Sequence, residues 1–138
     1  MTKVVLYSIL FLSIFQFDKS TEISYQLKNE NVVYQLKMKN GNQLSVCIDK
    51  DEKYIVYRYG SKNKIELEYP KEKDFSSFKK FEYSEYKRGG GVENSAMELK
   101  YLAFINNGVK YVVYDTYFAE ENKANAGIKV IESKKQNH

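Results

Sequence analysis

Between residues 22 and 131, polar and apolar side chains alternate with a period of two, the pattern of β-strands that bury one face. Residues 32–38 and 65–69 show this alternation most clearly. Asn40 and Gly41 follow the first of these runs, and this pair suits the left-handed dihedral angles of a tight hairpin turn. The sequence therefore predicts an all-β fold built from antiparallel hairpins.

The strands expected from this pattern are short, and turns join most of them. In chain order they cover residues 22–28, 32–38, 44–48, 54–59, 65–69, 81–88, 97–105, 109–118 and 127–131. Sequential hairpins can close into a barrel, which removes the exposed edge strands of an open sheet. We therefore expect an antiparallel up-and-down β-barrel, or a strongly curled sheet, of about eight strands. The same pattern also fits a sandwich of two sheets.

Three segments interrupt or modify the alternation. Residues 71–80 form a polar connection that carries two phenylalanines, and we expect a loop or a short helix there. Further along, Phe81 and Tyr83 share one face whereas Tyr86 falls on the other, which predicts a bulge. Residues 109–118 are apolar on both faces, so this strand should be central or line a pocket.

The N-terminus carries a charged start and a hydrophobic run, Lys3 followed by Val4–Phe15, which resembles a secretory signal peptide. The run is shorter than the about 20 residues that a membrane-spanning helix needs, so no stable span is expected after removal of the leader. We expect a signal peptide or N-terminal hydrophobic segment over 1–20, one β domain over 21–132 and a disordered tail over 133–138. The protein should be periplasmic or secreted, with tethering by an uncleaved N-terminal segment as the alternative.

Charge and cysteine content argue against several classes of function. The chain has 22 basic and 18 acidic residues, and lysines and glutamates interleave, so it lacks the basic stripe of a nucleic-acid-binding protein. Cys47 is the single cysteine, which excludes an intrachain disulfide and a cysteine-based metal site. We expect Cys47 to be a buried, inert thiol, because the only histidine that could activate it is His138 at the end of the chain.

Glu66 and Glu68 are the clearest pair of carboxylates in the sequence. They are two residues apart on one expected strand, so their side chains share a face about 7 Å apart, a spacing that glycosidases use. Both alternate with core positions and should therefore lie on a solvated face. The sequence predicts a protein that is not an enzyme and that holds neither cofactor nor metal.

The most distinctive motif is the run Arg88–Gly91, in which three consecutive glycines follow an arginine. Such a loop can present bare N–H groups and a guanidinium to a partner, although glycines occur more often in a plain bulged hairpin connection. We expect the loop of residues 86–94 and the turn of residues 106–108 to form the binding edge of the protein. The candidate partner-binding residues are Tyr86, Arg88, Gly89, Gly90, Gly91, Asn94 and Asn107.

The 13 tyrosines suggest an alternative, because their rings can form the walls of a ligand pocket and their hydroxyls can orient a ligand. Asp115 lies within the apolar strand 109–118, where a carboxylate must be paired, hydrogen-bonded or solvated. The alternative function is a lipocalin-like carrier of a small apolar ligand. Its candidate ligand-binding residues are Tyr101, Tyr111, Tyr114 and Asp115.

The order Arg88–Gly91, then a long strand over 97–105, then a turn over 106–108 resembles the layout of the small periplasmic inhibitors of c-type lysozyme. In that family of roughly eight-stranded barrels, a glycine-rich loop enters the active-site cleft of the hydrolase. The family's loop serine and disulfide have no counterpart here, and Asn107 replaces its basic turn residue. The resemblance implies a rigid exported protein that binds another protein, as an inhibitor or an immunity protein against a cell-envelope hydrolase or toxin.

Overall fold

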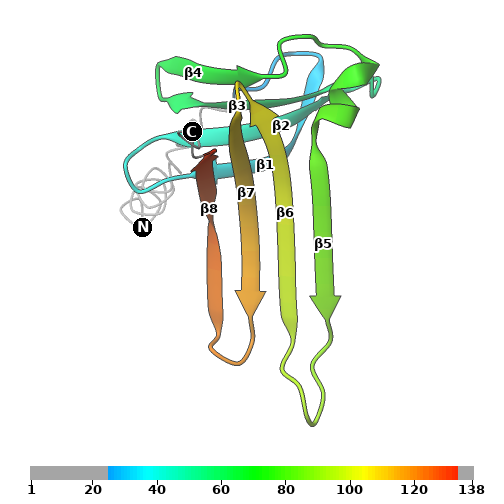
Figure 1. Ribbon diagram of the computed structural model, residues 1–138, viewed down its shortest axis with the longest axis vertical. Helices are drawn as coiled ribbons and strands as arrows, with labels where there is room; N and C mark the ends of the chain where they lie inside the picture. The colour runs from blue at the N-terminus through cyan, green and yellow to red at the C-terminus, as the bar shows by residue number, and fades with distance from the viewer. Residues whose placement is uncertain (1–24, 134–138) are drawn as a thin grey trace, which may run out of the picture.

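The computed structural model describes residues 25–133, and this part of the chain forms two four-stranded antiparallel sheets (Figure 1). Sheet 1 contains β1 (Glu30–Lys37), β2 (Gln43–Asp49), β3 (Ile55–Ser61) and β4 (Lys64–Tyr69). Sheet 2 contains β5 (Glu82–Arg88), β6 (Met97–Asn106), β7 (Val109–Phe118) and β8 (Lys123–Glu132). In each sheet, neighbouring strands are consecutive in the chain. The all-β prediction is confirmed.

The prediction of a closed barrel or a strongly curled sheet is wrong, because neither sheet closes on itself or joins the other. The series of hairpins ends at Tyr69, where a polar connection containing the 3-10 helix η1 (Phe75–Lys80) leads the chain to the second sheet. The short helix expected over 71–80 is therefore present. Within 22–28, the described residues are not a strand but an irregular segment beside β1.

The two sheets pack face to face over part of their length, and the main core lies between them. Its buried residues are Leu44, Val46, Tyr57, Phe104 and Val113. The Phe104 ring stacks on Tyr69 and Tyr111, with ring centroids 4.5 and 5.0 Å apart. In Figure 1 the strands of sheet 1 run across one end of sheet 2, so the other ends of β5–β8 extend well beyond sheet 1.

A second, smaller core covers the opposite face of sheet 1. Cys47, Tyr54 and Val56 are buried there, and the Arg58 guanidinium forms a two-point ion pair with Glu30, with N–O distances of 2.6 and 2.9 Å. Arg58 also donates a hydrogen bond to the main-chain oxygen of Tyr25. The segment before β1 is thus attached to the outer side of sheet 1, whose central strands β2 and β3 are buried on both faces. Cys47 is buried and free, as expected.

Irregular positions occur where the sequence did not indicate them. Sheet 1 has register shifts between Val32 and Tyr34 and between Tyr59 and Gly60. At Gly60 the chain approaches itself so closely that a Cβ atom would lie 2.0 Å from the Lys64 carbonyl oxygen. The bulge predicted in 81–88 is wrong, because β5 pairs with β6 without a register shift.

The hairpin between β6 and β7 follows the prediction closely. Asn107 and Gly108 have φ angles of 51° and 77°, the left-handed values that the turn requires. β7 lies between β6 and β8, which confirms that strand 109–118 is central. In residues 25–133, no helix is long and apolar enough to cross a membrane. The predicted leader lies in residues 1–24 and most of the predicted tail in 134–138, outside the described residues.

Candidate functional site

Sheet 2 turns only one of its faces toward sheet 1. Phe104 and Val113 point into the core between the sheets, so the side chains that alternate with them lie on the opposite, outer face. The apolar residues of this outer face are Tyr86, Met97, Leu99, Tyr101, Ala103, Ile105, Val112, Tyr114, Phe118 and Ile131. None of them belongs to the two buried clusters or packs against one. The described part of the chain therefore leaves an apolar sheet face without a covering layer.

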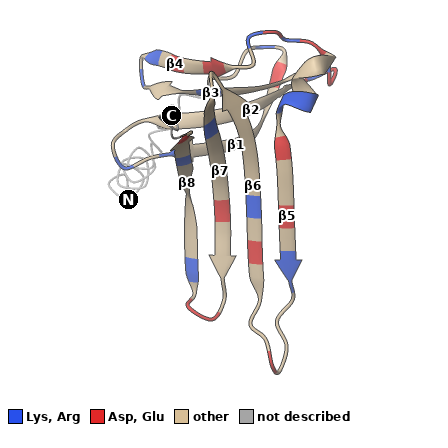
Figure 2. Ribbon diagram, in the orientation of Figure 1, with Lys and Arg blue, Asp and Glu red and all other residues tan. Residues whose placement is uncertain are grey.

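Basic side chains surround this outer face. By strand alternation, Arg88, Lys110, Lys123 and Lys129 point to the same side, whereas Glu82 is the one acidic residue that does so within β5–β8. Figure 2 shows two of these cations at the free ends of β5 and β8. The Lys129 ammonium lies 5.4 Å from the centroid of the Tyr114 ring. The face is thus apolar in its centre and positively charged at its rim.

The loop with the three glycines, residues 89–96, joins β5 to β6 at the end of sheet 2 that is farthest from sheet 1 (Figure 1). A Cβ atom at Gly89 or Gly91 would meet nothing within 4 Å, and the side chain of Val92 is fully exposed. The Arg88 guanidinium donates a hydrogen bond to the Ser95 carbonyl oxygen at 3.0 Å. Arg88 therefore holds the base of an otherwise exposed loop.

The second part of the expected binding edge lies elsewhere. Arg88 pairs with Met97 at one end of β6, whereas the turn with Asn107 follows Asn106 at the other end. Nine residue steps separate the two ends of β6, which corresponds to about 30 Å. The glycine loop and the Asn107 turn therefore do not form one continuous edge.

The four residues expected to bind a ligand are also divided. Tyr101 and Tyr114 are cross-strand partners whose side chains lie on the outer face, and Tyr101 also lies at the border of the cleft described next. Tyr111 lies on the inner face and stacks on Phe104 in the core. Asp115 lies on the inner face too, where it lines a cleft between the sheets.

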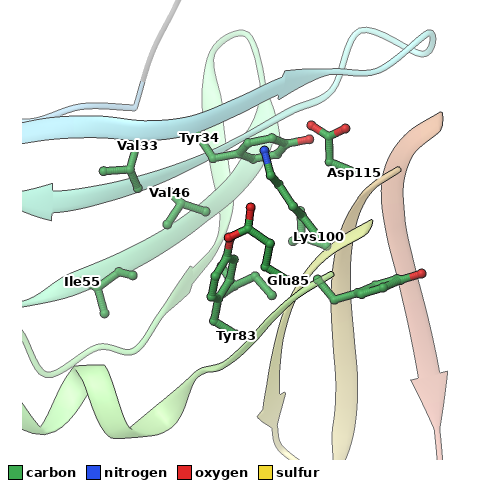
Figure 3. A pocket seen from close by; sticks show the side chains of 11 residues that line it. Val33, Tyr34, Val46, Ile55, Tyr83, Glu85, Lys100 and Asp115 are labelled. Atoms are coloured by element: carbon green, nitrogen blue, oxygen red, sulfur yellow. The ribbon is translucent and has the colours of Figure 1, made fainter. Parts of the chain in front are cut away.

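This inter-sheet cleft has a volume of about 450 Å³ (Figure 3). It is lined by Val33, Tyr34, Val46, Ile55, Tyr83, Glu85, Lys100, Tyr101, Leu102, Val113 and Asp115. Val33 and Tyr83 are 53% and 63% exposed, so the cleft opens to solvent between β1 and β5. Because the bulge in β1 breaks the alternation, the consecutive residues Val33 and Tyr34 both line it. A cavity of this size can hold a small organic molecule.

One end of the cleft is polar. Glu85, Lys100 and Asp115 are cross-strand neighbours on β5, β6 and β7, and Figure 3 shows the Tyr34 hydroxyl directed toward Asp115 from the other sheet. Burial, together with the charge of Asp115 and its hydrogen bond, raises the pKa of Tyr34 to about 12. Tyr34 therefore stays protonated and donates to the carboxylate. Sequence reasoning missed Tyr34 because its neighbour in space is on the other sheet.

Cys47 and Glu68, two described residues that the sequence singled out, lie in environments that keep them in their ordinary protonation states. Burial raises the pKa of Cys47 to about 11, so the thiol is not ionised near neutral pH. Burial alone would raise the pKa of Glu68, but its hydrogen bonds with Arg58 and Lys73 lower it. Glu68 is committed to these ion pairs, at 2.7 and 2.9 Å, and Glu66 is exposed. Residues 25–133 contain no group of acidic, histidine or cysteine side chains that could hold a metal ion.

Comparison with known proteins adds no relative. No family model matches the sequence, and no curated protein or solved structure matches the chain. The function must therefore be argued from the two exposed features described above, the outer face of sheet 2 and the inter-sheet cleft.

Proposed function

We propose that the chain is an exported, non-catalytic binding protein that attaches to a protein partner through the outer face of sheet 2 and the adjoining glycine loop. The observation that carries this proposal is the apolar outer face, which no described element covers. Contiguous apolar surface of this kind usually marks an interaction site in a soluble protein. Tyrosines, which the face presents at Tyr86, Tyr101 and Tyr114, are frequent hot-spot residues in interfaces.

The charges around the face indicate the chemistry of the partner. Lys110, Lys123 and Lys129 surround an apolar centre, and a partner with an apolar patch and an acidic rim would complement this arrangement. The loop of residues 89–96, which carries the fully exposed Val92, extends beyond this face, as a segment that enters a cleft would. Together with the leader-like N-terminus, these features support an envelope hydrolase or toxin as the partner, with this chain as its inhibitor or immunity protein.

The test compares variants that alter the two faces of sheet 2 differently. In the first, Tyr101→Ser and Tyr114→Ser are combined, which removes two rings from the outer face. The control is Tyr117→Ser, because Tyr117 is also a half-exposed tyrosine of β7 but belongs to the inner side. A third variant, Arg88→Ala, releases the base of the loop.

Each variant is used to capture proteins from envelope extracts, and any partner is then purified and titrated against the same variants. We expect the dissociation constant to rise at least about tenfold for the double variant and to stay unchanged for Tyr117→Ser. High salt should weaken the complex because the rim is charged. A partner that binds the double variant and the wild type equally well would contradict the assignment of the outer face.

A further inference from the structure

The inter-sheet cleft has apolar walls from both sheets. Val46 and Ile55 contribute from sheet 1, and Leu102 and Val113 contribute from sheet 2. Val46 and Val113 are almost fully buried, so the floor of the cleft is continuous with the main core. A molecule in the cleft would therefore bury its apolar part against rigid, well-packed side chains.

The polar end of the cleft has more negatively charged than positively charged side chains. On the inner face of sheet 2, the carboxylates of Glu85, Glu98 and Asp115 lie near the ammonium groups of Lys87 and Lys100. Lys87 pairs with Glu85 and Glu98 at 3.0 and 3.3 Å, and Lys100 pairs with Glu98 at 2.6 Å. Both lysines are thus engaged by carboxylates other than Asp115.

Asp115 keeps an uncompensated negative charge. It has a cross-strand lysine neighbour, yet no described lysine or arginine forms an ion pair with it within 4.0 Å. The hydrogen bond from the neutral Tyr34 hydroxyl orients the carboxylate without cancelling its charge. A half-buried carboxylate at the edge of an apolar cavity is favourable for a cation and unfavourable for an anion.

We propose that the inter-sheet cleft binds an amphipathic organic cation, with its apolar body between the two sheets and its ammonium group on Asp115. The charge of the occupant follows from Asp115, and its apolar part follows from the walls. The polar end of this site is separate from the outer face of sheet 2, because the side chains of Asp115 and Tyr34 lie on the opposite side of that sheet. Tyr101 is the one residue that the two sites share.

The experiment uses three probes of similar shape and different charge: naphthylmethylammonium, naphthylmethanol and naphthoate. Each is titrated into the full chain by calorimetry near neutral pH and at low salt. We expect the ammonium compound to bind about tenfold more tightly than the alcohol, because it adds a charge-assisted hydrogen bond, and we expect the naphthoate to bind most weakly. Equal binding of the ammonium and the alcohol, or no binding of the ammonium at millimolar concentration, would overturn the proposal.

Two variants locate the site. Asp115→Asn keeps the shape of the side chain and its ability to accept from Tyr34, and it should abolish the preference for the ammonium while leaving the affinity for the alcohol unchanged. The matched control is Glu121→Gln, which removes an exposed acid from the loop between β7 and β8 and should leave all affinities unchanged. The same loss of preference in both variants would show a non-specific charge effect and overturn the assignment.

A third variant fills the cleft. Val33→Trp places a large ring at the exposed mouth, outside the core, and should weaken the binding of both the ammonium and the alcohol. The chain has no other tryptophan, so the fluorescence of this residue also reports whether the variant is folded. A folded Val33→Trp protein that binds the probes with unchanged affinity would place them elsewhere. None of these substitutions changes a side chain of the outer face, so a failed test here leaves the protein-binding proposal standing.

Discussion

Sheets 1 and 2 have the same number of strands and the same simple order, but they differ in how many of their faces are covered. In sheet 1 the neighbouring residues Val46 and Cys47 point to opposite faces, and their side chains are 2% and 0% exposed. In sheet 2 Val113 is buried between the sheets, whereas its neighbour Tyr114 belongs to the uncovered outer face. The centre of sheet 1 is therefore covered on both faces, whereas sheet 2 leaves one face open to the proposed partner.

Ion pairs differ between the sheets in the same way. Arg58 and Glu30 are fully buried in sheet 1, where water cannot reach either charged group. Lys87, Lys100 and Glu98 in sheet 2 form pairs that are partly or largely exposed. Removing one member of the buried pair should be costly, because the remaining charge stays without a partner. Removing one member of an exposed pair should have little effect.

The largest expected effect on stability comes from weakening the contact between the two sheets. Phe104→Ala removes the ring that touches Tyr57, Tyr69, Phe81 and Tyr111, and it should lower the free energy of unfolding by about 4 kcal/mol. Urea denaturation followed by tyrosine fluorescence measures the change. Leu99→Ala, on the outer face of the same strand, is the control. Similar losses for both would mean that the outer face is covered by a layer that contributes to stability.

The next effect concerns the buried ion pair. Arg58→Met leaves Glu30 and Glu68 without the guanidinium and should lower the free energy of unfolding by about 3 kcal/mol. Combining it with Glu30→Gln should recover part of this loss, since the buried carboxylate is then neutral. Lys100→Met in sheet 2 should leave the urea midpoint unchanged. If Arg58→Met lowers the free energy of unfolding no more than Lys100→Met does, burial does not make the ion pairs of the two sheets differ in their contribution to stability.

Local patterns were sufficient to predict most strands of sheet 2. The turn at Asn107 and Gly108 could be recognised from its residues, and it fixes the register of β6 against β7. That register alone makes Lys100 and Asp115 cross-strand neighbours, because both are equally far from the turn. The polar end of the cleft was therefore partly predictable from the sequence.

The relation between the sheets could not be predicted in the same way. Whether the chain closes into one barrel or opens into two sheets depends on whether β4 pairs with β5, and the alternation within each strand is the same in both cases. The approach of Tyr34 to Asp115 depends on how the sheets cross, which no local pattern encodes. The candidate ligand-binding residues Tyr101 and Tyr111 were grouped together because opposite faces of a sheet look equivalent until its covering is known.

The last of these effects on stability should appear in acid. Burial alone would raise the pKa of Glu30, but the Arg58 guanidinium, the Leu27 N–H group and the Tyr54 hydroxyl lower it from 4.5 to about 2. The folded state thus favours the ionised form, so this contribution to stability is complete above pH 4.5 and is lost as the pH falls toward 2. The loss near pH 2 should be no larger than that caused by Arg58→Met, because protonated Glu30 can still accept hydrogen bonds from Arg58.

Urea midpoints measured from neutral pH down to pH 2 test this expectation. The slope of the free energy of unfolding against pH shows how much of the acid sensitivity comes from each carboxylate. Glu30→Gln should flatten the slope in the acid range, although the lowered pKa of Glu68 leaves part of it in place. Glu98→Gln, in the exposed pairs of sheet 2, should leave the slope nearly unchanged at moderate salt, since solvent screens those charges. If Glu98→Gln flattens the slope more than Glu30→Gln does, acid sensitivity belongs to sheet 2, and the contrast between a stable base and an exposed binding sheet fails.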